Sequence, residues 1–94
     1  MSYGFLIHGE TDDVGVAVRD LKAGEIVTGV TQKDRQEVTL TLRQDVPLGH
    51  KLALRDKQSG DTIVKYHEVI GRAVTAIQKG DHVHVHNIKS VRWG

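Results

Sequence analysis

Three histidines alternate near the end of the sequence, in His82-Val83-His84-Val85-His86-Asn87. If residues 82–88 form a strand, the three imidazoles lie on one face, with roughly 6.5 to 7 Å between successive positions. Two of them could then share a divalent metal ion, because neutral imidazole is a good ligand for Zn, Fe or Mn. A catalytic metal site usually also needs a third protein ligand and an open position. The alternative is a solvated strand face that happens to carry histidine, and the spacing alone leaves both possibilities open.

A second candidate group, Gly49-His50-Lys51, follows the only proline of the chain, Pro47. Side chains at the start of a strand can point into a cleft, and the Lys51 ammonium is suited to pairing with a carboxylate. An ordinary surface pair is the alternative. His8 and His67 are more typical of histidines at strand ends or in packing than of ligands.

The elements that must position these residues are short β-strands. Apolar residues alternate with polar ones over residues 38–43, a period of two that is typical of a half-buried strand. Residues 14–18 and 52–54 repeat this pattern, and residues 62–66 and 82–88 are two further runs rich in β-formers. The sequence therefore predicts five strands joined by short loops.

The stretch from residue 69 to residue 77 fits two structures. Its apolar residues would share one face of a helix, but Gly71 costs about 1 kcal/mol there relative to alanine. Strand is therefore favoured over helix. Pro47 lacks a backbone donor and would damage a central strand, so residues 45–49 are expected to form a loop.

Three segments share an order of residue types, which is a small or polar residue, glycine, an acid, any residue and an aliphatic residue. They are residues 23–27, 59–63 and 79–83. Each is expected to be a tight turn that leads into a strand. The similarity arises either from internal repetition or from the chance recurrence of glycine-acid turns in β proteins.

Length and composition restrict the class of protein. The 94 residues fit one domain, residues 1–94, and the 38% of apolar and 27% of charged residues are globular in proportion. With no cysteine, the chain offers neither a disulfide nor a thiol nucleophile. The formal net charge is +1 with both signs interspersed, so we expect no nucleic-acid partner. No stretch reaches the ~20 apolar residues of a membrane span, and we expect an unprocessed, cytoplasmic, soluble protein.

Five ordered motifs resemble the altronate and galactarate dehydratases, whose amino-terminal portion is a small β-clip module called the SAF domain. The motifs are His8 with residues 13–18, then residues 43–54, 60–66, 70–73 and 80–87. The resemblance implies an all-β fold of the SAF type. In altronate dehydratases the module is fused to a much larger catalytic portion, so this chain resembles a stand-alone small subunit that works with a separate large subunit.

The resemblance also implies a reaction, the β-elimination of water from a sugar acid. Residues 87–93 are more similar to the small subunit of sulfolactate sulfo-lyase, a split member of the same family that releases sulfite, and this is the alternative function. A non-catalytic module that binds sugar acids is a third possibility. No nucleophile elbow, phosphate loop or carboxylate pair is evident, so the chain is not expected to be active alone.

Site residues follow from the resemblance as expectations. His84 and His86 are expected to be catalytic and to ligate a divalent metal, with Fe(II) as the family expectation, near the junction with the large subunit. His50, Lys51 and Asn87 are expected to bind the hydroxy-acid substrate. His67 departs from the family pattern, because it stands where relatives usually have glycine after Lys65-Tyr66.

Overall fold

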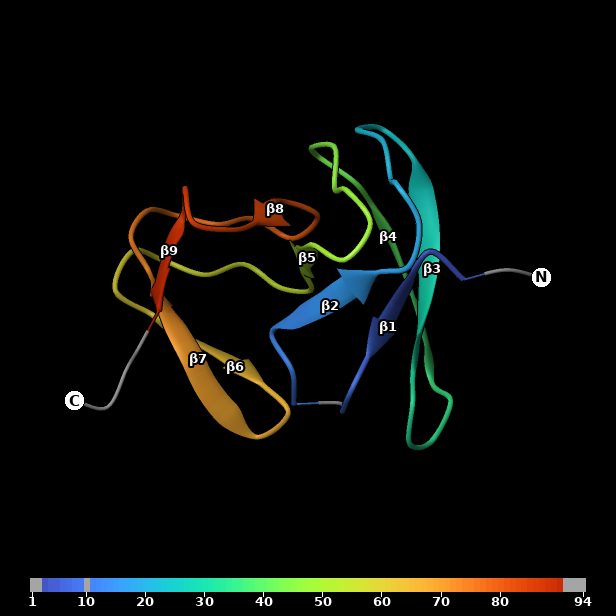
Figure 1. Ribbon diagram of the computed structural model, residues 1–94, viewed down its shortest axis with the longest axis horizontal. Coiled ribbons are helices and arrows are strands. Elements are labelled where there is room, and N and C mark those ends of the chain that lie inside the picture. The colour runs from blue at the N-terminus through green and yellow to red at the C-terminus, as the bar shows by residue number, and fades with distance from the viewer. Residues whose placement is uncertain (1–2, 10, 91–94) are drawn as a thin grey trace.

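Short strands make up the regular structure of the chain (Figure 1). The structure is a computed structural model that describes residues 3–90 except residue 10. In this part of the chain the strands are β1 (Phe5–Ile7), β2 (Val14–Ala17), β3 (Ile26–Thr31), β4 (Glu37–Thr41), β5 (Lys51–Ala53), β6 (Thr62–Lys65), β7 (Glu68–Ala73), β8 (His82–Val83) and β9 (Ile88–Ser90). The all-β class is confirmed. The described residues contain no helix that could cross a membrane.

Four of the five strands predicted from the sequence are present. They are β2, β4, β5 and β6, each within one or two residues of the expected range. The choice of strand over helix after residue 68 is also confirmed, because β7 runs from Glu68 to Ala73. Gly71 packs closely in β7, where an added Cβ would lie 2.8 Å from the carbonyl oxygen of Lys89 on β9.

The prediction of one strand over residues 82–88 is wrong. β8 ends at Val83, and the chain turns before β9 begins at Ile88. The reason is the buried side chain of Asn87, whose Nδ2 donates to the His82 carbonyl at 2.7 Å and whose Oδ1 accepts from the His84 N–H at 3.0 Å. Such side-chain hydrogen bonds offer the backbone an alternative to the sheet ladder. The three alternating histidines therefore do not share one strand face.

Two sheets hold the strands. The larger has the order β4-β3-β1-β2-β5-β8, and the smaller has the order β6-β7-β9. β1 and β3 are parallel, whereas the other strand pairs are antiparallel. Figure 1 shows β1 to β4 at one end of the molecule, the small sheet at the other, and β5 and β8 between them. β8 is thus the last strand of the large sheet and lies against β5.

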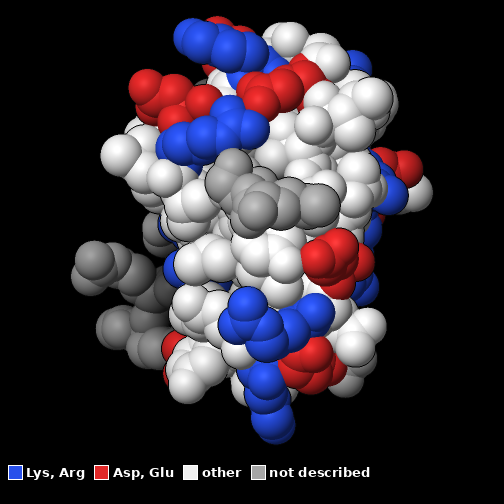
Figure 2. Space-filling view, turned by 90° about the vertical axis from the view of Figure 1, so that its right-hand side faces the viewer, with Lys and Arg blue, Asp and Glu red and all other residues white. Residues whose placement is uncertain are grey.

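The apolar side chains form two adjoining cores. One surrounds Phe5 and Leu52 and contains residues of β1 to β5, and the other surrounds Ile63 and Val83. Burial of these apolar side chains supplies the main favourable free energy of folding. On the outside, Lys and Arg side chains lie among Asp and Glu side chains over the face that Figure 2 shows.

The three glycine-acid segments adopt the same turn. Gly24, Gly60 and Gly80 have φ values of 87°, 94° and 92°, and each is followed by the acid that precedes a strand. In each turn the acid accepts a hydrogen bond from the N–H three residues earlier. The pairs are Lys22 with Glu25, Gln58 with Asp61, and Gln78 with Asp81. Isolated bridges, Leu21 with Val46 and Lys57 with Ile77, join neighbouring turns of this kind.

Candidate functional site

Three histidine side chains meet where β8 lies against β5. His82 is paired with Leu52 in the β5–β8 ladder, and His50 immediately precedes β5. His50 Nδ1 lies 2.9 Å from His82 Nε2, and the rings of His50 and His84 are stacked with their centroids 4.4 Å apart. One nitrogen from each of the three rings lies within 4.8 Å of the others. We call these three residues the histidine cluster.

The turn before β5 explains why residue 50 can be a histidine. Residues 47–50 form a fourth turn of the repeated kind, because Gly49 has a φ of 84° and the His50 N–H donates to the Pro47 carbonyl at 2.9 Å. In the other turns an acid accepts from the N–H three residues earlier. Pro47 has no N–H. An acid at residue 50 would therefore have no such donor, and His50 instead faces the other histidines.

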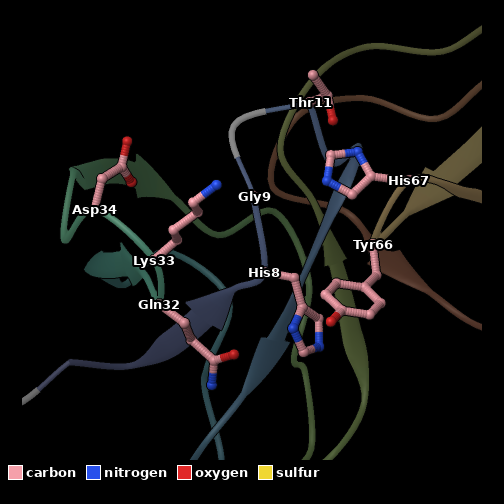
Figure 3. A pocket seen from close by; sticks show the side chains of 8 residues that line it. All are labelled: His8, Gly9, Thr11, Gln32, Lys33, Asp34, Tyr66 and His67. Carbon is pink, nitrogen blue, oxygen red and sulfur yellow. The ribbon is translucent and has the colours of Figure 1, made fainter.

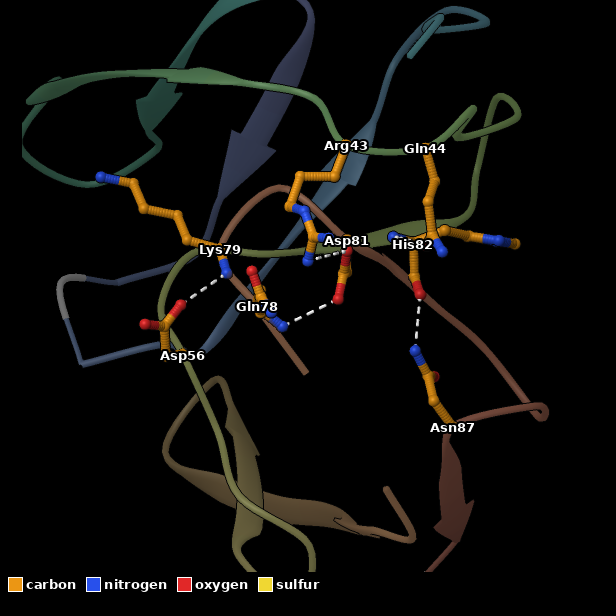
Figure 4. A network of polar contacts seen from close by, with 8 residues as sticks. All are labelled: Arg43, Gln44, Asp56, Gln78, Lys79, Asp81, His82 and Asn87. Atoms are coloured by element: carbon orange, nitrogen blue, oxygen red, sulfur yellow. Dashed lines mark hydrogen bonds and ion pairs between the residues drawn. The ribbon is translucent and has the colours of Figure 1, made fainter. Parts of the chain in front are cut away.

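Polar contacts fix the two other members of the cluster, and Figure 4 shows those around His82. The His82 N–H donates to Gln44 Oε1 at 2.9 Å, and its carbonyl accepts from Asn87. The preceding Asp81 is almost buried and contacts Arg43 at 3.2 Å. Because Asn87 also accepts from the His84 N–H, its side chain holds the backbone on both sides of Val83. Both hydrogen-bonding groups of the Asn87 amide are thus used within the turn.

The cluster includes two of the residues expected from the sequence, His50 and His84, and adds His82. His86 is exposed and outside the group of three, with its ring centroid 5.2 Å from that of His82. The resemblance singles out His84 and His86, and alternation alone does not distinguish His82 from them. The β5–β8 pairing, which brings it to His50, is a long-range contact that spacing along the chain does not reveal.

Lys51 lies beside a different set of residues. Successive side chains of a strand point to opposite faces, so Lys51 diverges from His50. Burial lowers the pKa of Lys51, and the positive charge of Lys65 on β6 lowers it further. The five sequence candidates therefore separate into the cluster with His50 and His84, the adjacent His86, the turn residue Asn87, and Lys51 near Lys65.

The histidine cluster fits a divalent metal ion. Three neutral imidazoles can each offer a nitrogen, and three protein ligands with an open position are typical of catalytic metal sites. Burial lowers the pKa of His82, and the charges of His50, His86 and His84 lower it further, which favours the neutral form that a metal requires.

The lowered pKa of His82 predicts that acid weakens the fold. The unfolded state takes up a proton near the ordinary histidine pKa of about 6.5, whereas the folded state takes it up only at lower pH. This contribution to stability is present above the unfolded pKa and is lost as the pH falls through the folded pKa. We expect the melting temperature of the metal-free protein to fall between pH 7.5 and pH 5.5, and the His82→Gln variant to show a smaller fall. An equal fall in both proteins, measured by circular dichroism, would rule out this role of His82.

Comparison with known proteins identifies the family of the chain. The sequence profile of the altronate/galactarate dehydratase SAF domain matches residues 3–91. The chain is 42% identical over 94 residues to the (2R)-sulfolactate sulfo-lyase subunit alpha of Chromohalobacter salexigens, covering 99% of this chain and 100% of that one. It is 47% identical over 64 residues to the subunit of the same name from Paracoccus pantotrophus, 68% of this chain and 96% of that one. It is also 44% identical over 79 residues to altronate dehydratase of Escherichia coli, 84% of this chain but 15% of that enzyme.

The short strands and glycine turns, with this profile match, define the class of protein as a SAF domain. The chain belongs to the altronate/galactarate dehydratase SAF-domain family. The match covers the whole of the sulfo-lyase subunit alpha but only 15% of altronate dehydratase.

Proposed function

We propose that this chain is the small subunit of a lyase that acts on (2R)-sulfolactate and releases sulfite. The observation that carries the proposal is the end-to-end identity of 42% with a stand-alone sulfo-lyase subunit alpha. The second candidate is a small subunit that eliminates water from a sugar acid. It is favoured by the 44% identity with altronate dehydratase, although that match covers 15% of the enzyme.

We further propose that a separate large subunit completes the active site. The two subunits would work together in the cytoplasm. Two exposed apolar side chains stand in the turns that carry the histidines, Leu48 beside His50 and Val85 beside His84, with exposures of 61% and 81%. Large apolar side chains exposed next to a polar cluster are suited to a protein interface. The histidine cluster would then lie at the junction of the two subunits, and the small subunit alone would be inactive.

The reaction is a β-elimination. A base removes the proton from the carbon next to the carboxylate, and the leaving group departs from the neighbouring carbon with the electrons of its bond. The negative charge that develops on the substrate carboxylate makes the main contribution to the activation free energy. A divalent metal, with Fe(II) as our expectation, supplies Lewis-acid stabilisation of this charge when bound. His50, His82 and His84 would hold it. His86 is not one of these three residues, so its imidazole is available to accept the proton from the substrate carbon.

The test of the function is turnover by the small chain together with its large partner. The two chains are co-expressed, supplied with Fe(II), and given sulfolactate, altronate and galactarate in separate assays for sulfite and for the keto product. Sulfite from sulfolactate supports the first candidate, and a keto-deoxy acid from a sugar acid supports the second. Activity of the small chain alone would contradict its role as an incomplete subunit, and no product from any of the three acids with an assembled complex would contradict both candidates.

A further inference from the structure

Two adjoining cavities lie at the edge of the molecule opposite β8. The larger, of about 750 Å³, is lined by the segments that follow β1 and β3 and by the turn between β6 and β7. The smaller, of about 250 Å³, shares His8 and Gln32 with it and adds Lys65. Figure 1 shows these three connections together at the lower edge, while β8 lies at the upper one. We call the joint space the lower groove, lined by His8, Gln32, Lys33, Lys65, Tyr66 and His67.

The groove gathers cationic and hydrogen-bonding side chains, together with one carboxylate, Asp34, whose Oδ1 accepts a hydrogen bond from Thr31 Oγ1 at 2.6 Å. Figure 3 shows Lys33 and Asp34 on one side of the larger cavity and the rings of His8, Tyr66 and His67 on the other. Lys65 lies close enough to Lys51 for its charge to lower the pKa of that residue. Among the described residues neither Lys51 nor Lys65 forms an ion pair with a carboxylate. Of these two lysines Lys65 lines the groove, and an ammonium group without a counter-charge at a cavity favours a bound anion.

The turn between β6 and β7 is strained. Its two central residues, Tyr66 and His67, have φ values of 55° and 66°, the left-handed region that hairpin turns usually fill with asparagine and glycine. The turn is held there because Asp12 Oδ1 accepts from the Tyr66 N–H at 2.8 Å. The Tyr66 ring is exposed and lies 4.9 Å from that of His8. A strained conformation kept by bulky residues at a cavity points to a functional role, since it lowers stability without filling a core.

We infer that the lower groove is a second acid-binding site, which takes a small hydroxy acid through its carboxylate or sulfonate group. Lys65 and Lys33 would pair with the acidic groups, and His8 and His67 would hydrogen-bond the hydroxyl and the remaining oxygens. The inference rests on the proposed function only for the chemical class of the ligand. The groove is formed by different residues from the histidine cluster, so it can bind an acid whether or not the cluster catalyses.

The test is a titration of the isotope-labelled full chain with L-malate, followed by NMR, with sodium chloride at the same ionic strength as the control. We expect malate, but not chloride, to produce saturable chemical-shift changes of the backbone amides in the groove. They should centre on Thr11, Lys33, Lys65 and His67.

Two variants and a matched control sharpen the test. Lys65→Met should weaken malate binding by about tenfold or more, because it removes a charge and keeps the length of the side chain. His67→Gly should weaken binding by about fivefold and at the same time raise the melting temperature by about 4 °C or more, since glycine relieves the left-handed strain. The control Lys79→Met, on an exposed lysine near β8, should leave the affinity unchanged. Shifts centred on the histidine cluster, or equal affinity of the wild type and Lys65→Met, would overturn the inference, and neither result depends on turnover.

Discussion

His84→Ala lowers the turnover of the assembled two-subunit lyase by about 100-fold or more. The expectation follows from the position of His84, whose ring stacks on His50 and whose nitrogen is one of the three that lie within 4.8 Å. Without it, two imidazoles remain, and a divalent metal loses one of its three protein ligands. The affinity for Fe(II) or Zn(II), measured by titration of the small chain alone, should therefore fall together with the turnover.

The design of this experiment separates chemistry from assembly. Size-exclusion chromatography shows whether the variant still binds the large subunit, and Lys89→Ala, an exposed position on β9, is the matched control. Lost turnover with retained substrate affinity would exclude a module that only binds substrate. Turnover within about twofold of the wild type, in an assembled complex, would show that His84 has no catalytic or metal-binding role and would leave a structural one.

Gly80→Ala lowers the free energy of unfolding by about 3 kcal/mol or more. Two costs add in this variant, because Gly80 has a φ of 92° and an added Cβ would overlap the carbonyl oxygen of Thr41. The backbone cannot move away easily, since the Gly80 N–H donates to Ala53 and its carbonyl accepts from Arg43, both at 2.9 Å. The measurement is chemical denaturation monitored by circular dichroism.

Two other glycines calibrate that result. Gly60 has a similar φ of 94° but an added Cβ meets no atom within 4 Å, so Gly60→Ala should cost only the left-handed strain, about 1–2 kcal/mol. Gly9 has neither feature, and Gly9→Ala should change the stability by less than about 0.5 kcal/mol. Equal losses for Gly80→Ala and Gly60→Ala would mean that the contact with Thr41 carries no cost.

The sequence predicts the local structure of this protein well, because alternation and glycine turns act over a few residues. The β4 pattern and the three glycine-acid turns are examples, and both are found as expected. It fails at residues 82–88, where the alternation is regular but one buried asparagine side chain ends the strand. Propensity favoured the strand, and a specific hydrogen-bonded turn overrode it.

The candidate site was predicted only in part, for a related reason. Residues 50 and 84 could be selected as chemically capable, but their closeness depends on the pairing of β5 with β8, which joins residues about thirty positions apart. The lower groove was not predicted at all. Its lining comes from three connections that are remote in the sequence, and the one local signal was the unusual histidine at position 67.

The turn at Pro47 has a consequence for how this family can change its chemistry. In three turns the acid before the strand accepts a hydrogen bond that closes the turn, so replacing it lowers the stability of the fold. At the fourth, proline has removed that obligation, and replacing residue 50 removes its contact with His82 within the cluster but no hydrogen bond that closes the turn. Enzymes usually trade stability against new activity, but here a substitution at a position facing the histidine cluster leaves the turn itself intact. Position 50 is therefore a place where substrate or metal preference can evolve while the backbone of the turn is kept.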